Sequence, residues 1–66
     1  MTEQQARELA VAAIEVVTVG EPESVADTTV LFKNPDGTFS VCDNGEEAVA
    51  TTEAQAIQFI VENLTA

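Results

Sequence analysis

The first quarter of the chain repeats apolar side chains at the spacing of an α-helix. From Thr2 to about residue 17 they form one stripe, made of Ala6, Leu9, Ala10, Ala13, Ile14 and Val17. Thr2 is followed three residues later by Gln5, which is the pattern of a capping box at a helix start. The β-branched run before Gly20 weakens the helix, and we expect Gly20 or Glu21-Pro22 to stop it.

Two later stretches alternate apolar and polar side chains, as strands do. They are TTVLFK (28–33) and TFSVC (38–42). Between them, the segment Asn34–Gly37 (NPDG) has residues that strongly favour a turn, and we expect Lys33 to pair with Thr38 across it. This register makes one face of the hairpin apolar, with Val30, Phe32, Phe39 and Val41.

A second turn signal, Asn44-Gly45, is the strongest short hairpin signal that a sequence can carry. It pairs Asp43 with Glu46, Val41 with Ala48 and Phe39 with Ala50. The two turns agree on which face carries Phe39 and Val41, and together they predict a three-stranded antiparallel meander. The third strand, residues 46–50, has the weakest β propensity of the three.

The last segment of the chain again has helical periodicity. Thr51 or Thr52 caps it, Gln55 closes a capping box on Thr52, and the helix runs to about residue 64. Its apolar stripe is Ala54, Ile57, Ile60, Val61 and Leu64. We therefore predict one α+β domain over residues 1–66, ordered α-β-β-β-α, with both helices on one face of the sheet. If the third strand does not form, the order is α-β-β-α.

The charge of the chain is strongly unbalanced. Twelve acidic residues face two basic ones, which gives a formal net charge of −10. Such a charge repels nucleic acid and anionic membranes and favours a basic protein partner. Solubility, or life in a salty cytoplasm, is the alternative reason for the acidity. Disorder is not expected, because 45% of the residues are apolar and they are periodic.

The residue types exclude most kinds of catalytic or metal site. The chain has no His, and Cys42 is its only cysteine, so neither an internal disulfide nor a structural zinc site is expected. No nucleophile has a base beside it and no glycine-rich phosphate loop occurs. We predict a protein that is no enzyme and needs no cofactor. The lone thiol, the polar first residues and the short apolar runs predict a cytoplasmic protein.

Three features are candidates for binding a partner. The first is a carboxylate cluster in the connector after the first helix, namely Glu21, Glu23 and Asp27. The second is a cluster around the second turn, namely Asp43, Glu46 and Glu47. The third is Phe59, which falls among polar residues of the last helix and could be an apolar anchor. Phe59 could instead fold over the helix edge onto the first helix, or be singly exposed.

The sheet face away from the helices is a further candidate. By the register above it carries Leu31, Ser40 and Val49, with Thr29, Cys42 and Glu47 beside them. A mildly apolar, uncovered face on so short a chain is typical of a homodimer or partner surface.

Two functions are consistent with this sequence. The first is an acidic protein-binding module that occupies a basic surface of a larger partner, such as a nucleic-acid groove. It would act by nucleic-acid mimicry, as small phage and mobile-element inhibitors do, without binding nucleic acid itself. The second is a self-associating structural or accessory protein, whose acidic surface serves only solubility.

Overall fold

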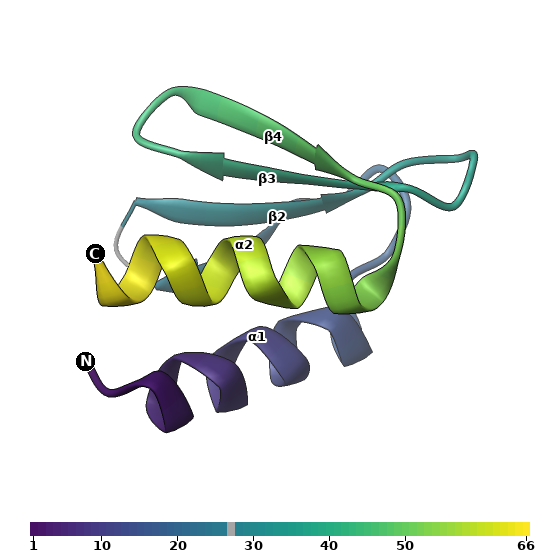
Figure 1. Cartoon of the computed structure of the whole chain (residues 1–66). Helices are drawn as coiled ribbons and strands as arrows, with labels where there is room; N and C mark the ends of the chain where they lie inside the picture. Colours follow the sequence, from purple (N-terminus) through teal and green to yellow (C-terminus); the bar gives the residue numbers. More distant parts are fainter. Residues whose placement is uncertain (27) are drawn as a thin grey trace.

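The computed structural model describes residues 1–26 and 28–66 and shows an α+β fold of two layers (Figure 1). One antiparallel sheet forms the first layer, in the order β1-β2-β3-β4. Two helices, packed against each other, form the second layer on one face of that sheet. The elements are α1 (Glu3–Val16), β1 (Glu23–Ala26), β2 (Thr29–Lys33), β3 (Phe39–Asp43), β4 (Glu46–Ala50) and α2 (Glu53–Thr65). The α+β class is confirmed, and the sheet has one strand more than the predicted meander.

The additional strand, β1, lies in the segment that we expected to be a connector. Glu23 pairs with Leu31 and Ser24 with Val30, and the register shifts between Ser24 and Ala26. The strand has little β propensity of its own, so its formation depends on pairing with β2 and on Val25, which packs against the core. Propensity alone could not reveal it.

Helix α1 begins and ends about where predicted. Thr2 accepts a hydrogen bond from the Gln5 backbone N–H, while the Gln5 side chain accepts one from the Thr2 backbone, so the capping box is complete. The helix ends at Val16, because Val17 is already extended. The buried face of the helix and its C-cap consists of Ala6, Ala10, Ala13 and Val17, whereas Leu9 is exposed.

Helix α2 is capped by Thr52, whose side chain accepts from the Gln55 backbone N–H at 3.1 Å. The Gln55 side chain does not complete the expected box. Its oxygen accepts from the backbone N–H and the hydroxyl of Thr51, at 2.8 and 3.0 Å. Ala56, Ile60 and Val61 are buried, and Ala54 of the predicted stripe is exposed.

The β3–β4 hairpin has the predicted register. Asp43 pairs with Glu46, Val41 with Ala48 and Phe39 with Ala50. Asn44 and Gly45 have φ angles of 53° and 89°, and two successive positive values are the geometry of a type I′ turn. The third strand therefore forms despite its weak propensity, because its turn matches the twist of the flanking strands.

The predicted register of the β2–β3 hairpin is wrong by one residue. Lys33 pairs with Phe39 rather than with Thr38. The Asn34 N–H donates to the Thr38 carbonyl at 2.8 Å, which leaves a three-residue loop, and Gly37 has a φ of 91°. A type I turn closed by a residue in the left-handed region gives such an odd-numbered loop, whereas we expected a four-residue one.

This shift exchanges the two faces of β2, since neighbouring side chains point to opposite sides of a sheet. Leu31 and Thr29 face the helices and are 0% and 2% exposed. Val30 and Phe32, which we placed in the core, are half-buried on the other face. Leu31 and Thr29 are thus not on the uncovered face where we placed them.

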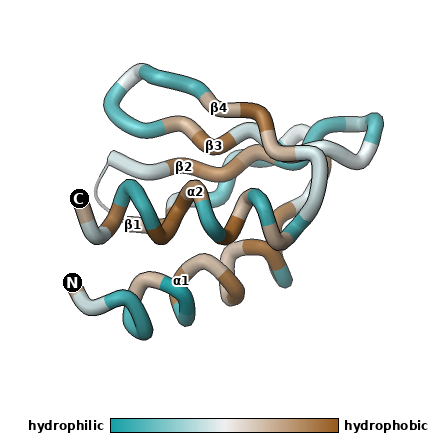
Figure 2. The backbone as a smooth tube through the Cα atoms, in the orientation of Figure 1, coloured by the Kyte–Doolittle hydropathy of each residue, from teal (hydrophilic) through white to brown (hydrophobic). Residues whose placement is uncertain are grey.

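The core lies between the sheet and the helices. Figure 2 shows hydrophobic segments in both layers, on the strands as well as on the helices. The buried cluster consists of Ala10, Ala13, Val17, Leu31, Phe39, Val41, Ala50, Ala56 and Ile60. In the described part of the chain, neither helix has the length and apolar character needed to cross a membrane.

Candidate functional site

The face of the sheet away from the helices is not covered by either helix (Figure 1). We call it the open face and define it by the residues that the register places there: Val30, Phe32, Ser40, Cys42, Glu47 and Val49. Phe32 and Val30 replace the expected Leu31 and Thr29, so the open face is more apolar than the sequence predicted. Ser40 and Val49 lie on it as expected.

A shallow hollow of about 400 Å³ lies on the open face. The strands contribute Phe32, Lys33, Ser40, Cys42 and Glu47 to its lining. The rest of its lining comes from two loops, with Val19, Gly20, Asn34 and Pro35. The hollow brings one cation and one carboxylate, Lys33 and Glu47, to the border of an apolar depression.

The polar residues of the hollow are bound within the fold. Ser40 is 6% exposed, and its hydroxyl accepts a hydrogen bond from the Asn34 side-chain amide at 3.1 Å. The same amide donates to the Thr38 hydroxyl at 2.9 Å. Asn34 therefore holds the loop to the sheet, and its hydrogen bonds explain why a serine can be buried there.

Cys42 has the chemistry of a structural thiol. Burial, and then the neighbouring Glu47 carboxylate 3.9 Å away, raise the pKa of the thiol above its usual value. A raised pKa leaves little of the nucleophilic thiolate at neutral pH. Nor does any group of three potential metal ligands occur within residues 1–26 and 28–66.

The second carboxylate cluster lies at the β3–β4 turn, and its members differ in role. Glu46 and Glu47 are exposed on β4. Asp43 is half-buried and accepts hydrogen bonds from the hydroxyls of Thr28 and Thr29, at 2.7 and 3.3 Å. Asp43 thus fastens the start of β2 to the end of β3, which leaves Glu46 and Glu47 as the carboxylates free to meet a partner.

The two described residues of the connector cluster, Glu21 and Glu23, lie apart from the turn cluster. Glu21 is exposed in a bridge with Thr18, and Glu23 pairs with Leu31. Leu31 is the middle residue of β2, whereas Asp43 pairs with Thr29, its first residue. Asp27 lies outside the described residues. Of the described residues, Glu23 on β1 and Glu46 and Glu47 on β4 thus lie on the two opposite edge strands of the sheet.

Phe59 is half-buried and packs against the core cluster. It is therefore neither a core residue of the predicted stripe nor a fully exposed aromatic. The expected stripe omitted Ala56, which is 0% exposed and lies one turn before Phe59 on the same side of α2. Including Ala56 widens the buried face toward Phe59 and puts Phe59 on its flank.

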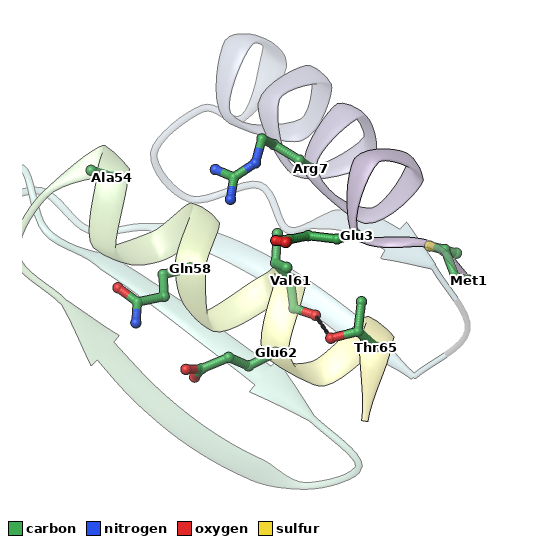
Figure 3. A pocket seen from close by; sticks show the side chains of 8 residues that line it. All are labelled: Met1, Glu3, Arg7, Ala54, Gln58, Val61, Glu62 and Thr65. Carbon is green, nitrogen blue, oxygen red and sulfur yellow. Dashed lines mark hydrogen bonds between the residues drawn. The ribbon is translucent and has the colours of Figure 1, made fainter.

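A second open groove of about 590 Å³ runs between the two helices. Figure 3 shows Arg7 and Glu3 extending from α1 and Gln58 and Glu62 from α2. At the far end, the Thr65 hydroxyl donates to the Val61 carbonyl at 2.7 Å. One arginine, Arg7, and two glutamates, Glu3 and Glu62, line this groove.

Comparison of the chain with protein-family models, with curated proteins and with solved structures found no match.

Proposed function

We propose that this protein is a small binding module that occupies a basic surface of a larger protein, in the manner of an inhibitor that imitates nucleic acid. The observation that carries the proposal is the acidic turn, by which we mean Asp43, Glu46 and Glu47 at one end of the sheet. It lies beside the apolar open face, and Lys33 lies at the opposite end of β2.

The wider charge pattern supports the same proposal. Nine of the eleven described carboxylates are exposed and two are half-buried, so all of them contribute to the negative potential around the protein. A net charge of −10 steers a basic partner toward the protein and raises the association rate. The apolar open face beside the acidic turn supplies the desolvated centre that a charged rim alone lacks.

The test compares two charge reversals of equal size. Glu46→Lys with Glu47→Lys changes the acidic turn, and Glu8→Lys with Glu15→Lys changes exposed positions of α1. Each pair moves the net charge from −10 to −6, because two glutamates become two lysines. Asp43 is left unchanged, since its hydrogen bonds support the fold.

We expect basic proteins from a cell lysate to bind the wild type and the α1 variant at low salt, and to be lost from the turn variant. Retention should fall as salt rises, because exposed charges are screened over about 8–10 Å at physiological ionic strength. Equal loss from both variants would mean that only net charge matters. Full retention by both would remove the acidic turn from the proposal.

A second candidate function is self-association through the open face. The corrected register favours it more than the sequence did, since Phe32 and Val30 lie there with Val49, which is 56% exposed. Lys33 and Glu47 at the hollow would also be complementary across a two-fold axis. Sedimentation velocity at increasing protein concentration tests this candidate, and Val49→Asp should abolish any dimer that uses this face.

A further inference from the structure

Strand β4 forms a regular edge of the sheet. It pairs with β3 without a register shift over all five residues, and the first four of them are exposed. Within the described residues, no strand lies beyond it in the sheet. Such an edge offers backbone groups that can pair with another chain.

The turn geometry decides which backbone groups of β4 point outward. In a two-residue hairpin the residues that flank the turn, Asp43 and Glu46, form a hydrogen-bonded pair, and such pairs alternate along the ladder. The backbone groups of Glu46, Ala48 and Ala50 are thus directed to β3. Those of Glu47 and Val49 are directed away from the sheet.

The side chains at this edge suit a basic, extended occupant. Glu46 and Glu47 are consecutive, so they project to opposite faces of the strand, and both are exposed. A strand that paired with β4 would meet a carboxylate on each of its faces. On the open face it would also meet Val49, which is 56% exposed.

The helix layer contributes an apolar contact near the same edge. Helix α2 packs on β3 and β4, and α1 packs on β1 and on α2. The residues of α2 that line the groove toward α1 include Val61 and Gln58. Phe59 is about 200° from Val61 around the helix, so it lies on the flank away from α1, on the β4 side.

We propose that β4 binds an extended, basic segment of the partner as a fifth strand of the sheet. Lysine or arginine side chains of that segment lie beside Glu46 and Glu47, and apolar ones lie against Val49 and Phe59. The inference rests on the proposed function and specifies how the partner is held: main-chain hydrogen bonds give affinity, and alternate side chains give specificity. A second copy of the chain is a poorer occupant, since each copy carries a charge of −10.

The probe is a synthetic seven-residue peptide, Lys-Lys-Val-Val-Lys-Lys-Val, which as a strand carries both lysine and valine on each of its faces. It is titrated into the full chain and followed by amide NMR. We expect the amides of Glu47 and Val49 to shift most and to become protected from hydrogen exchange. The same peptide, N-methylated at its five central residues, keeps its charge and side chains but loses the backbone N–H donors of those residues. It should bind at least tenfold more weakly.

A pair of variants tests the edge from the side of the protein. Val49→Pro removes the outward N–H without removing a hydrogen bond to β3, and proline is tolerated at such edge positions. Val49→Thr keeps the N–H and changes the side chain. We expect Val49→Pro to weaken peptide binding at least tenfold and Val49→Thr to weaken it less, with both variants folded by circular dichroism.

The outcomes separate this inference from the proposed function. If both peptides bind equally and Val49→Pro has no effect, the acidic surface binds a basic partner but β4 does not pair with it, and the inference is wrong. If neither peptide binds at low salt, the proposed function fails as well. Protection of Glu47 and Val49 without peptide, together with a dimer in sedimentation, would show that a second copy occupies the edge.

Discussion

The two edges of the sheet are protected in different ways. Strand β1 has four residues, and its register with β2 shifts between Ser24 and Ala26. Next to it, Val19 forms an isolated bridge with Lys33. Strand β4 has five residues and a continuous register, and it carries the charges of Glu46 and Glu47.

Geometry at β1 and charge at β4 can both prevent an edge strand from pairing with another chain, but they differ in which chains they exclude. A shifted, short edge cannot template another strand, whatever that strand carries. On the proposal above, the carboxylates of the regular β4 edge repel an acidic strand and attract a basic one. The β4 edge would then select its occupant by charge, whereas the β1 edge is a poor template for any strand.

The largest effect should come from β2, which lies between the β1 edge and β3. Leu31 on β2 is 0% exposed, and Leu31→Ala should cost about 2–5 kcal/mol of unfolding free energy. Phe32→Ala is the matched control, because Phe32 is its neighbour on the open face and is half-buried. Urea unfolding of both variants measures the difference. A larger loss for Phe32→Ala would mean that β2 has the register first predicted.

The next effect isolates the β1 edge. Gly20 has a φ of 87°, and a Cβ built there meets nothing within 4 Å, so Gly20→Ala introduces backbone strain and no clash. The cost should be about 1–2 kcal/mol, and Gly20→Asn should cost less, because Asn tolerates this region. Hydrogen exchange should show faster opening of β1 than of β4. Uniform acceleration across the sheet would contradict an edge-specific effect.

A smaller effect tests the backbone of the β4 edge. Ala48→Pro removes a hydrogen bond to β3, whereas Val49→Pro removes an outward N–H. Ala48→Pro should therefore be less stable than Val49→Pro by about 1 kcal/mol. Thermal unfolding of the two variants gives the order. The reverse order would show that the outward and inward residues of β4 are exchanged.

The smallest effect concerns Asp36, which belongs to neither edge. Hydrogen bonds from the Thr38 hydroxyl and backbone N–H, at 2.6 and 3.0 Å, lower the pKa of Asp36 below 3.8. The stability that this carboxylate adds is present above the pKa of the unfolded chain and is lost as pH falls through the lowered value. With Asp36→Asn, the free energy of unfolding should therefore fall less steeply as the pH is lowered into the acid range. An unchanged acid profile would argue against these hydrogen bonds in solution.

The sequence predicted the parts of the fold that rest on local chemistry. The Thr2 cap and the Asn44-Gly45 turn depend on residues a few positions apart, and both form as expected. It did not predict β1 or the register of β2, because TVLFK has apolar side chains on both faces. Only the loop geometry at Gly37 separates the two registers of that hairpin.

The candidate site was predictable in part for the same reason. Glu46, Glu47 and Val49 follow from the turn that the sequence specifies, and they lie where expected. Leu31 was placed on the wrong face with the rest of β2. The support that Asp43 gives to Thr28 and Thr29 joins strands by hydroxyl groups that are common on any surface, so no pattern marked it.

The pairing of α1 with α2 also sets the order in which the chain can mature on the ribosome. The two helices pack extensively against each other, yet residues 17–52 separate them. At about 5–20 residues per second, α1 waits several seconds for its partner to be synthesised. Until then, the face that α1 later buries stays exposed. Its residues are Ala6, Ala10 and Ala13, which expose far less apolar area than leucines would and have a high helix propensity. An alanine face thus lowers the risk of non-specific association while the nascent chain lacks α2.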